Sequence, residues 1–71
     1  DSTKAGWAYL FTGIMDSKNG YYEKASINLS EAKENAPRQD SMLFFKFIIT
    51  SESYINFAVT NKRVSNLTKK P

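Results

Sequence analysis

The fold is decided by residues 13–37, which read GIMDSKNGYYEKASINLSEAKENAP. Within this stretch, apolar residues recur at steps of three and four: Tyr22, Ala25, Leu29, Ala32 and Ala36. That spacing is typical of a helix with one buried face. An Asn19-Gly20 turn signal precedes the stripe, and Pro37 disfavours helical geometry at the residue before it. The stretch therefore predicts a helix over 22–36 that packs against the helix before it.

A first helix is predicted over residues 4–18, capped by Ser2 or Thr3. Its apolar residues cover more than one face, so we expect neighbours on most of its sides. Gly13 in its interior costs about 1 kcal/mol relative to alanine, which indicates close approach of another helix. On the second helix, the face opposite the apolar stripe is expected to face solvent; it carries Lys24, Asn28, Glu31 and Asn35.

The apolar run that starts at residue 42 predicts a third helix, capped by Asp40 or Ser41. A strand is the alternative, because β-branched and aromatic residues are frequent there. A single strand would have no partner in this chain to satisfy its backbone groups, so we favour the helix. Residues 51–53 either precede a fourth helix or lie within one long helix. The sequence thus predicts one all-α domain over residues 1–71, with three to four antiparallel helices and a polar tail at 68–71.

Composition argues against several classes of site. The chain has no cysteine and no histidine, so the usual protein ligands of zinc, haem and iron–sulfur clusters are missing. Histidine is also the usual base for a nucleophilic serine, and no pair of carboxylates is placed together by the sequence. We therefore predict no cofactor, no metal site and no enzymatic activity. No run of about 18 apolar residues is present, so we predict no membrane span.

Location is left open by the sequence. The chain begins at Asp1, which suggests a processed protein or a fragment. The lack of cysteine fits both a cytosolic and an exported protein. A cytoplasmic location is slightly favoured, with an exported fragment as the alternative.

Charge is uneven along the chain, whose net charge is +3. Residues 53–71 contain no acidic residue and four basic ones: Lys62, Arg63, Lys69 and Lys70. These cations are candidate contacts for phosphate or another anion. The alternative is a solvated helix end whose cations suit the C-terminal dipole. Nucleic acid is the less favoured partner, because Glu23, Glu31 and Glu34 would oppose a phosphate backbone.

Residues 6–39 resemble a tetratricopeptide repeat, a helical hairpin of about 34 residues. The resemblance rests on residues in the family's spacing: Tyr9, Gly13, Gly20, Tyr22, Ala25, Leu29, Ala32 and Pro37. Two positions depart from the pattern, with Thr12 where leucine is usual and Asp16 where tyrosine is usual. Residues 40–67 keep the helical character but lack the turn glycine and the alanines. They therefore predict a divergent second hairpin or a capping helix.

The resemblance implies an inner surface lined by the first helix of each unit. The matching positions here are Trp7, Leu10, Ile14, Ser17, Lys18, Phe44, Ile48 and Glu52. The large apolar ones form the candidate site for partner binding or self-association: Trp7, Leu10, Ile14, Phe44 and Ile48. Such a surface suits an amphipathic helix, a hydrophobic peptide or a second copy of the chain, and the alternative is that these residues are core. The predicted function is a non-enzymatic protein–protein interaction module, with a nucleic-acid-associated domain as the alternative.

Overall fold

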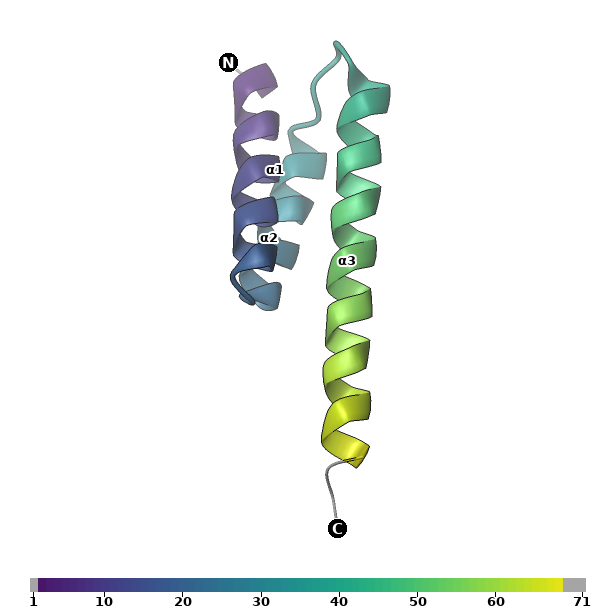
Figure 1. The fold of residues 1–71 in the computed structure, drawn as a ribbon. Helices are drawn as coiled ribbons and strands as arrows, with labels where there is room; N and C mark the ends of the chain where they lie inside the picture. The colour runs from purple at the N-terminus through teal and green to yellow at the C-terminus, as the bar shows by residue number, and fades with distance from the viewer. Residues whose placement is uncertain (1, 69–71) are drawn as a thin grey trace.

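The computed structural model describes the backbone of residues 2–68 and the side chains of residues 4–65. It contains three helices: α1 over Ser2–Lys18, α2 over Tyr22–Glu34 and α3 over Ser41–Thr68. The first two form an antiparallel hairpin, and α3 runs back alongside them in the direction of α1 (Figure 1). The all-α prediction is confirmed, and residues 2–68 contain no strand.

The turn between α1 and α2 follows the glycine signal in the sequence. Gly20 has a φ of 85°, in the left-handed region that favours glycine. The Tyr21 N–H donates to the carbonyl oxygen of Asp16 over 2.9 Å, and the Gly20 N–H donates to that of Ser17 over 3.2 Å. This pair of hydrogen bonds is the Schellman motif, which satisfies carbonyl groups at a helix C-terminus. Lys18 lies in the last turn of α1, where a cation is favourable.

Two glycines allow α1 and α2 to approach closely. A β-carbon on Gly13 would lie 2.9 Å from Cδ2 of Leu29 and 3.3 Å from the carbonyl oxygen of Ala25. At Gly6 the neighbour is main chain, because a β-carbon there would overlap the carbonyl oxygen of Asn35. Gly13 therefore has the packing role that its position predicted, and Gly6 has the same role at the other end of the hairpin.

One apolar core joins the three helices. Its buried members are Leu10 of α1, Ala25, Leu29 and Ala32 of α2, and Phe44, Ile48 and Ile55 of α3. The predicted stripe of α2 supplies three of them, and Tyr22 and Ala36 at the ends of the stripe are half-buried. Burial of apolar surface contributes about 25 cal/mol per Å², so this packing is the main force that holds α3 against the hairpin.

The ends of α1 and α2 differ from the predicted ends by two residues. α1 begins at Ser2, so Ser2 and Thr3 belong to its first turn, and their side chains lie outside the described residues. α2 ends at Glu34 rather than Ala36. Pro37 explains the second difference, because its ring disfavours helical geometry at Ala36.

The third helix is continuous. α3 has 28 residues, so residues 51–53 continue it, and of the two alternatives the structure has the single long helix. The carbonyl oxygen of Asp40 accepts from the Phe44 N–H over 2.9 Å at its start. At 1.5 Å per residue the helix is about 42 Å long, against about 25 Å for α1. It extends beyond the turn of the hairpin (Figure 1), and the molecule measures 53 × 18 × 15 Å.

A polar pair links the middle of the hairpin. Nδ2 of Asn28 donates to a carboxylate oxygen of Asp16 over 2.8 Å, and both side chains are half-buried. Asn28 therefore turns toward α1, and the prediction that it faces solvent beside Lys24 is wrong. The acceptor is on the neighbouring helix, which helical spacing within α2 does not reveal. Asp16 occupies the position at which the repeat pattern has tyrosine, so a hydrogen bond stands where an aromatic contact is usual.

The apolar character of α3 is relevant to the prediction that the chain has no membrane span. Over Ser41–Ser65 the helix is long and apolar enough to cross a membrane by length and composition alone, and 22% of its most apolar window is buried in the fold. Lys46 and Glu52 lie within this segment, and Glu52 pairs with Lys33 of α2 at 2.6 Å. Core helices that are mostly buried also meet this criterion, whereas most of this window of α3 is not buried in the fold. The absence of a membrane span therefore stays a prediction.

Candidate interaction groove

The five apolar residues predicted as a binding or self-association site lie together where α1 meets α3. Leu10, Phe44 and Ile48 are in the core, with at most 1% of each exposed. Trp7 and Ile14 are half-buried and pack against that core. The fully buried residues present no surface in this fold, so a contact with a partner would use Trp7, Ile14 and their exposed neighbours.

Aromatic rings close the interface near the start of α1. The Trp7 ring lies edge-on to Phe44, with centroids 5.1 Å apart and an interplanar angle of 89°. Its centroid is also 6.3 Å from that of Phe47 and 5.8 Å from that of Phe11. Edge-to-face pairs contribute about 0.5–1.5 kcal/mol beyond their buried area. This cluster therefore fixes the spacing of the two helices at that end.

Toward the C-terminal end of α1, the two helices leave a hollow of about 350 Å³, which we call the α1–α3 groove. It is lined by Ile14, Ser17 and Lys18 of α1 and by Phe47, Thr50, Ser51 and Tyr54 of α3. Ser17 and Ser51 are buried, and their small side chains leave the space open. The Ser17 hydroxyl donates to the carbonyl oxygen of Ile14 over 2.7 Å, so its proton is not offered to a ligand.

The walls of the groove are apolar and accessible. Phe47 is 41% exposed and Tyr54 is 48% exposed. They belong to a row of residues at helical spacing along α3: Leu43, Phe47, Thr50, Tyr54 and Phe57. Phe11 and Met15 of α1 are exposed as well. Apolar side chains that gather around a hollow indicate an interaction site, whereas single exposed ones do not.

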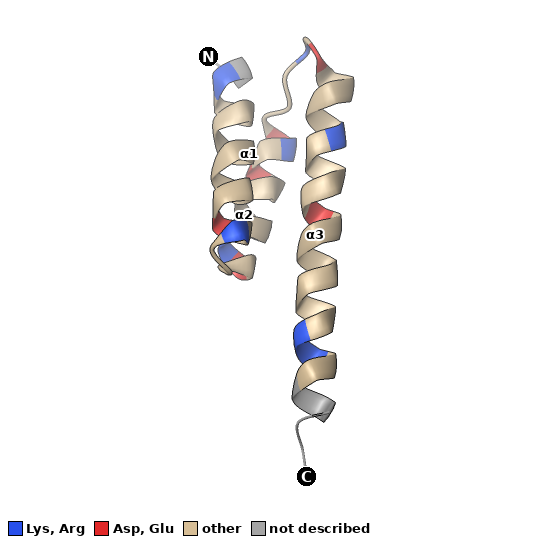
Figure 2. Ribbon diagram, viewed as in Figure 1, with Lys and Arg blue, Asp and Glu red and all other residues tan. Residues whose placement is uncertain are grey.

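Lys18 is the only charged residue in the groove lining. Among the side chains of residues 4–65, it forms no ion pair. The acidic residue nearest to it in sequence, Asp16, turns instead to Asn28 of α2. Figure 2 shows long uncharged stretches along both α1 and α3. The groove is therefore an apolar surface with one cation at its edge.

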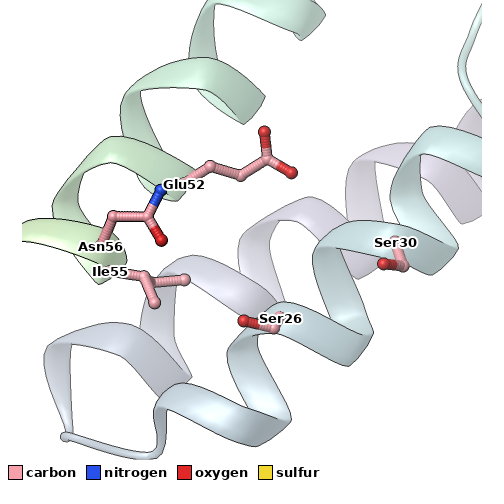
Figure 3. Close-up of a pocket in the computed structure, with 5 residues that line it drawn as sticks. All are labelled: Ser26, Ser30, Glu52, Ile55 and Asn56. Carbon is pink, nitrogen blue, oxygen red and sulfur yellow. The ribbon is translucent and has the colours of Figure 1, made fainter. Parts of the chain in front are cut away.

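A separate, polar notch of about 330 Å³ lies between α2 and α3. Figure 3 shows Ser26 and Ser30 of α2 across from Glu52, Ile55 and Asn56 of α3. Glu52 accepts from the Lys33 ammonium over 2.6 Å, and the two side chains are 40% and 44% exposed, so the pair contributes little stability. Glu52 thus faces α2, although the repeat resemblance implies the inner surface. Within the described residues, no three acidic side chains gather to hold a metal ion.

The predicted anion contacts lie near the end of α3. Lys62 and Arg63 are exposed and border an open hollow of about 490 Å³ next to the turn of the hairpin. Glu23 borders the same hollow, and its carboxylate would repel a phosphate. Lys69 and Lys70 lie outside the described residues.

Part of the groove was predicted from the sequence. Ile14, Ser17 and Lys18 are positions that the repeat resemblance places on the inner surface, and all three line the groove. The resemblance selected Phe44 and Ile48 on α3, whereas the four α3 residues of the lining were missed. Their spacing was the available signal. That spacing alone does not show which side of α3 borders the groove, because α3 carries apolar residues on nearly all sides.

Comparison with protein-family models, with curated proteins and with solved structures finds no match to this chain. The tetratricopeptide resemblance of residues 6–39 therefore stays a prediction that rests on sequence spacing. The hairpin, its turn glycine and its close helix contact are features of the structure itself and depend on no family.

Proposed function

We propose that this chain is a non-enzymatic protein–protein interaction module whose α1–α3 groove binds an apolar helix of a partner. The observation that carries the proposal is the hollow of about 350 Å³ between α1 and α3, walled by the exposed rings of Phe47 and Tyr54. In helix-in-groove recognition, an amphipathic helix lays its apolar face into a hydrophobic groove of this kind. The tetratricopeptide resemblance implies the same use of this surface.

The surroundings of the groove favour binding because its walls are held in place before a partner arrives. The Trp7 ring packs against Phe47 at one end of the groove. Ile14 packs on the buried core below. Binding costs less entropy when the contacting side chains are already ordered. Phe47 and Ile14 are therefore ordered by contacts within the fold, which lowers the entropy cost of binding a helix there.

The chemistry of the lining supports recognition rather than catalysis. Lys18 is its single charged group, and no carboxylate accompanies the hydroxyl groups of Ser17 and Ser51. A serine nucleophile needs an adjacent base to take its proton. The Ser17 hydroxyl instead donates its hydrogen bond to the main-chain carbonyl oxygen of Ile14. The polar notch between α2 and α3 is open to solvent, and its glutamate, Glu52, is already paired with Lys33.

Site-specific crosslinking in the organism that makes the protein tests the proposal. A photo-reactive phenylalanine analogue replaces Phe47 in one variant and Phe45 in the control. The two residues belong to the same helix and are 41% and 37% exposed, but only Phe47 lines the groove. We expect a discrete adduct with one partner at position 47 and none at position 45. Mass spectrometry identifies that partner, and its purified helix is expected to bind the purified chain and to lose affinity for Phe47→Ala.

Three other results are informative. Adducts of equal yield at positions 45 and 47 would indicate nonspecific contact and contradict the proposal. The lack of any adduct at position 47 would contradict it too. An adduct between two copies of the chain would assign the groove to self-association instead.

A further inference from the structure

We propose that α3 lies on the surface of an anionic lipid membrane, with the side opposite the hairpin turned into the bilayer interface. This inference goes beyond the proposed function and is independent of it, because it uses a different side of α3 from the α1–α3 groove. It follows from the part of α3 that the fold leaves uncovered, from the distribution of charge, and from the attachment of the hairpin.

α3 is apolar on nearly all sides, but the hairpin lies along only one of them (Figure 1). A helix that is apolar all round is typically buried in a protein core or in a membrane. The most apolar window of α3 is long and apolar enough to cross a membrane, yet only 22% of it is buried in the fold. A place in the core of this chain therefore does not account for the composition of α3, whereas contact with lipid does.

The side of α3 opposite its buried residues carries a row of exposed apolar side chains, which we call the outer face. Its members are seven or eight residues apart, so they lie on one line along the helix; they are Met42, Ile49, Phe57 and Val64. Within the described side chains they are the most exposed large apolar residues of α3, at 52–85%. Lys46 lies on the same line, and a lysine buries its alkyl stem at an interface while its ammonium reaches the headgroups.

The carboxylates of the described side chains are kept away from the outer face. Three belong to α2, and those of Asp16 and Glu52 turn toward α2, where they contact Asn28 and Lys33. The remaining one, that of Asp40, lies in the connection before α3.

Cations instead accompany the outer face toward its C-terminal end. Lys62 and Arg63 are exposed near the end of α3 (Figure 2), and residues 53–71 contain no acidic residue. Glu23, which borders the same hollow as these cations, belongs to α2 and therefore lies on the hairpin side of them. Basic residues beside an apolar segment attract anionic lipid headgroups, so this end of α3 complements an anionic membrane.

The hairpin decides that α3 lies in the membrane plane. It is attached to α3 through a buried core that includes Phe44, Ile48 and Ile55. α2 exposes charged side chains that hydrocarbon would not accommodate: Glu23, Lys24, Glu31, Lys33 and Glu34. A spanning α3 would have to carry these charges into the bilayer or release the hairpin. When α3 lies in the plane, the hairpin stays in water while the outer face enters the interface.

Binding of the purified chain to lipid vesicles tests this proposal. One set of vesicles is phosphatidylcholine alone, and the other is phosphatidylcholine mixed with the anionic lipid phosphatidylglycerol; flotation separates bound from free protein. Ile49→Ser removes an anchor of the outer face, and Ile27→Ser is its control. The two isoleucines are 62% and 63% exposed, but Ile27 belongs to α2.

A second pair of variants tests the charge. Lys62→Gln combined with Arg63→Gln neutralises the cations near the end of α3. The control, Lys18→Gln combined with Lys24→Gln, makes the same change of net charge on the hairpin. Far-UV circular dichroism checks that every variant keeps its helices.

We expect the wild-type chain to bind the anionic vesicles more tightly than vesicles of phosphatidylcholine alone. Ile49→Ser should weaken that binding about five- to 25-fold, because the exposed part of the isoleucine loses its transfer to lipid. Neutralising Lys62 and Arg63 should weaken it about 25-fold, which is about fivefold for each cation, and raised salt should weaken it too. Both control variants should bind as the wild-type chain does.

Three results would overturn the proposal: no binding to either kind of vesicle, equal binding to both, or equal losses in Ile49→Ser and Ile27→Ser. Light scattering without lipid adds a fourth. A dimer that Ile49→Ser dissociates, in a chain that binds no vesicles, would assign the outer face to a second copy. The groove is tested separately through Phe47, so none of these results decides the proposed function.

Discussion

Gly6 of α1 packs directly against the main-chain carbonyl group of Asn35, the residue that caps the C-terminus of α2. No side chain separates the two helices at this point. The contact joins the beginning of one helix to the end of the other, opposite the Gly20 turn. The hairpin is therefore closed at both ends, by a turn on one side and by backbone packing on the other.

Gly6→Ala is expected to destabilise the chain, because the new methyl group would overlap a main-chain oxygen that can move only with the helix. Overpacking of this kind costs about 1–3 kcal/mol, and it outweighs the gain of about 1 kcal/mol in helix propensity. Urea unfolding followed by far-UV circular dichroism measures the change. Ala8→Gly on the exposed side of α1 is the control, and it should lose about 1 kcal/mol by propensity alone. A Gly6→Ala variant as stable as wild type would mean that the helices do not meet there.

The Asp16–Asn28 hydrogen bond is expected to couple the two helices energetically. Asp16→Ala and Asn28→Ala should each destabilise the chain, and a double-mutant cycle should give a coupling of about 1 kcal/mol, since the hydrogen bond is partly buried between the two helices. Urea unfolding followed by circular dichroism gives the unfolding free energies of the wild type, the two single variants and the double variant. Strictly additive effects would show that the two side chains do not interact in solution.

Phe44 and Phe47 are expected to respond very differently to truncation. Phe44 is fully buried, so Phe44→Ala should cost about 3–5 kcal/mol. That is a large share of the roughly 4–10 kcal/mol expected for a domain of this size. Phe47 is 41% exposed but contacts Trp7 edge-on, so Phe47→Ala should cost about 1–2 kcal/mol while removing a wall of the groove. Thermal unfolding of both variants checks the contrast, and a similar loss for both would place Phe47 in the core.

The Lys33–Glu52 pair is expected to contribute less than about 1 kcal/mol to stability, because both side chains are substantially exposed. Glu52→Gln should therefore leave the unfolding free energy almost unchanged, and any loss should shrink at high salt. Glu31→Gln is the control for removal of an exposed carboxylate from a helix. A loss of several kcal/mol in Glu52→Gln alone would show that this pair anchors α3 to the hairpin.

The hairpin was predictable because the residues that define it act locally, and other residues at those positions would be energetically unfavourable. Gly20 has a backbone conformation that other residues adopt reluctantly, and Pro37 disfavours helical geometry at the residue before it. Gly13 costs about 1 kcal/mol of helix propensity relative to alanine, so its position indicated a close contact, and Leu29 makes that contact. Each of these constraints operates within a few residues, so the sequence pattern reveals it without knowledge of the rest of the fold.

The rotation of α3 was not predictable in the same way. Its apolar residues surround the helix, so hydrophobic spacing does not distinguish the buried side, with Phe44 and Ile48, from the groove side, with Phe47 and Tyr54. The choice depends on which side fits the surface of the hairpin, where Trp7 packs against Phe44. Asn28 illustrates the same limit, because its inward orientation depends on an acceptor in another helix.

Because α3 is longer than the hairpin, its two ends should differ in how often their helical hydrogen bonds open. Among the residues of α3 whose side chains the structure describes, Val59 is the last half-buried one, and residues 60–64 are exposed. A short helical segment with little buried surface is marginal in water, so the amides of residues 60–64 should open and exchange with solvent far faster than those near Phe44. The hairpin and α3 as far as Val59 then form one cooperative unit, and the exposed segment that follows unwinds and rewinds without unfolding it. A protein that touched only this end would have to order it first, and its association would be correspondingly weaker.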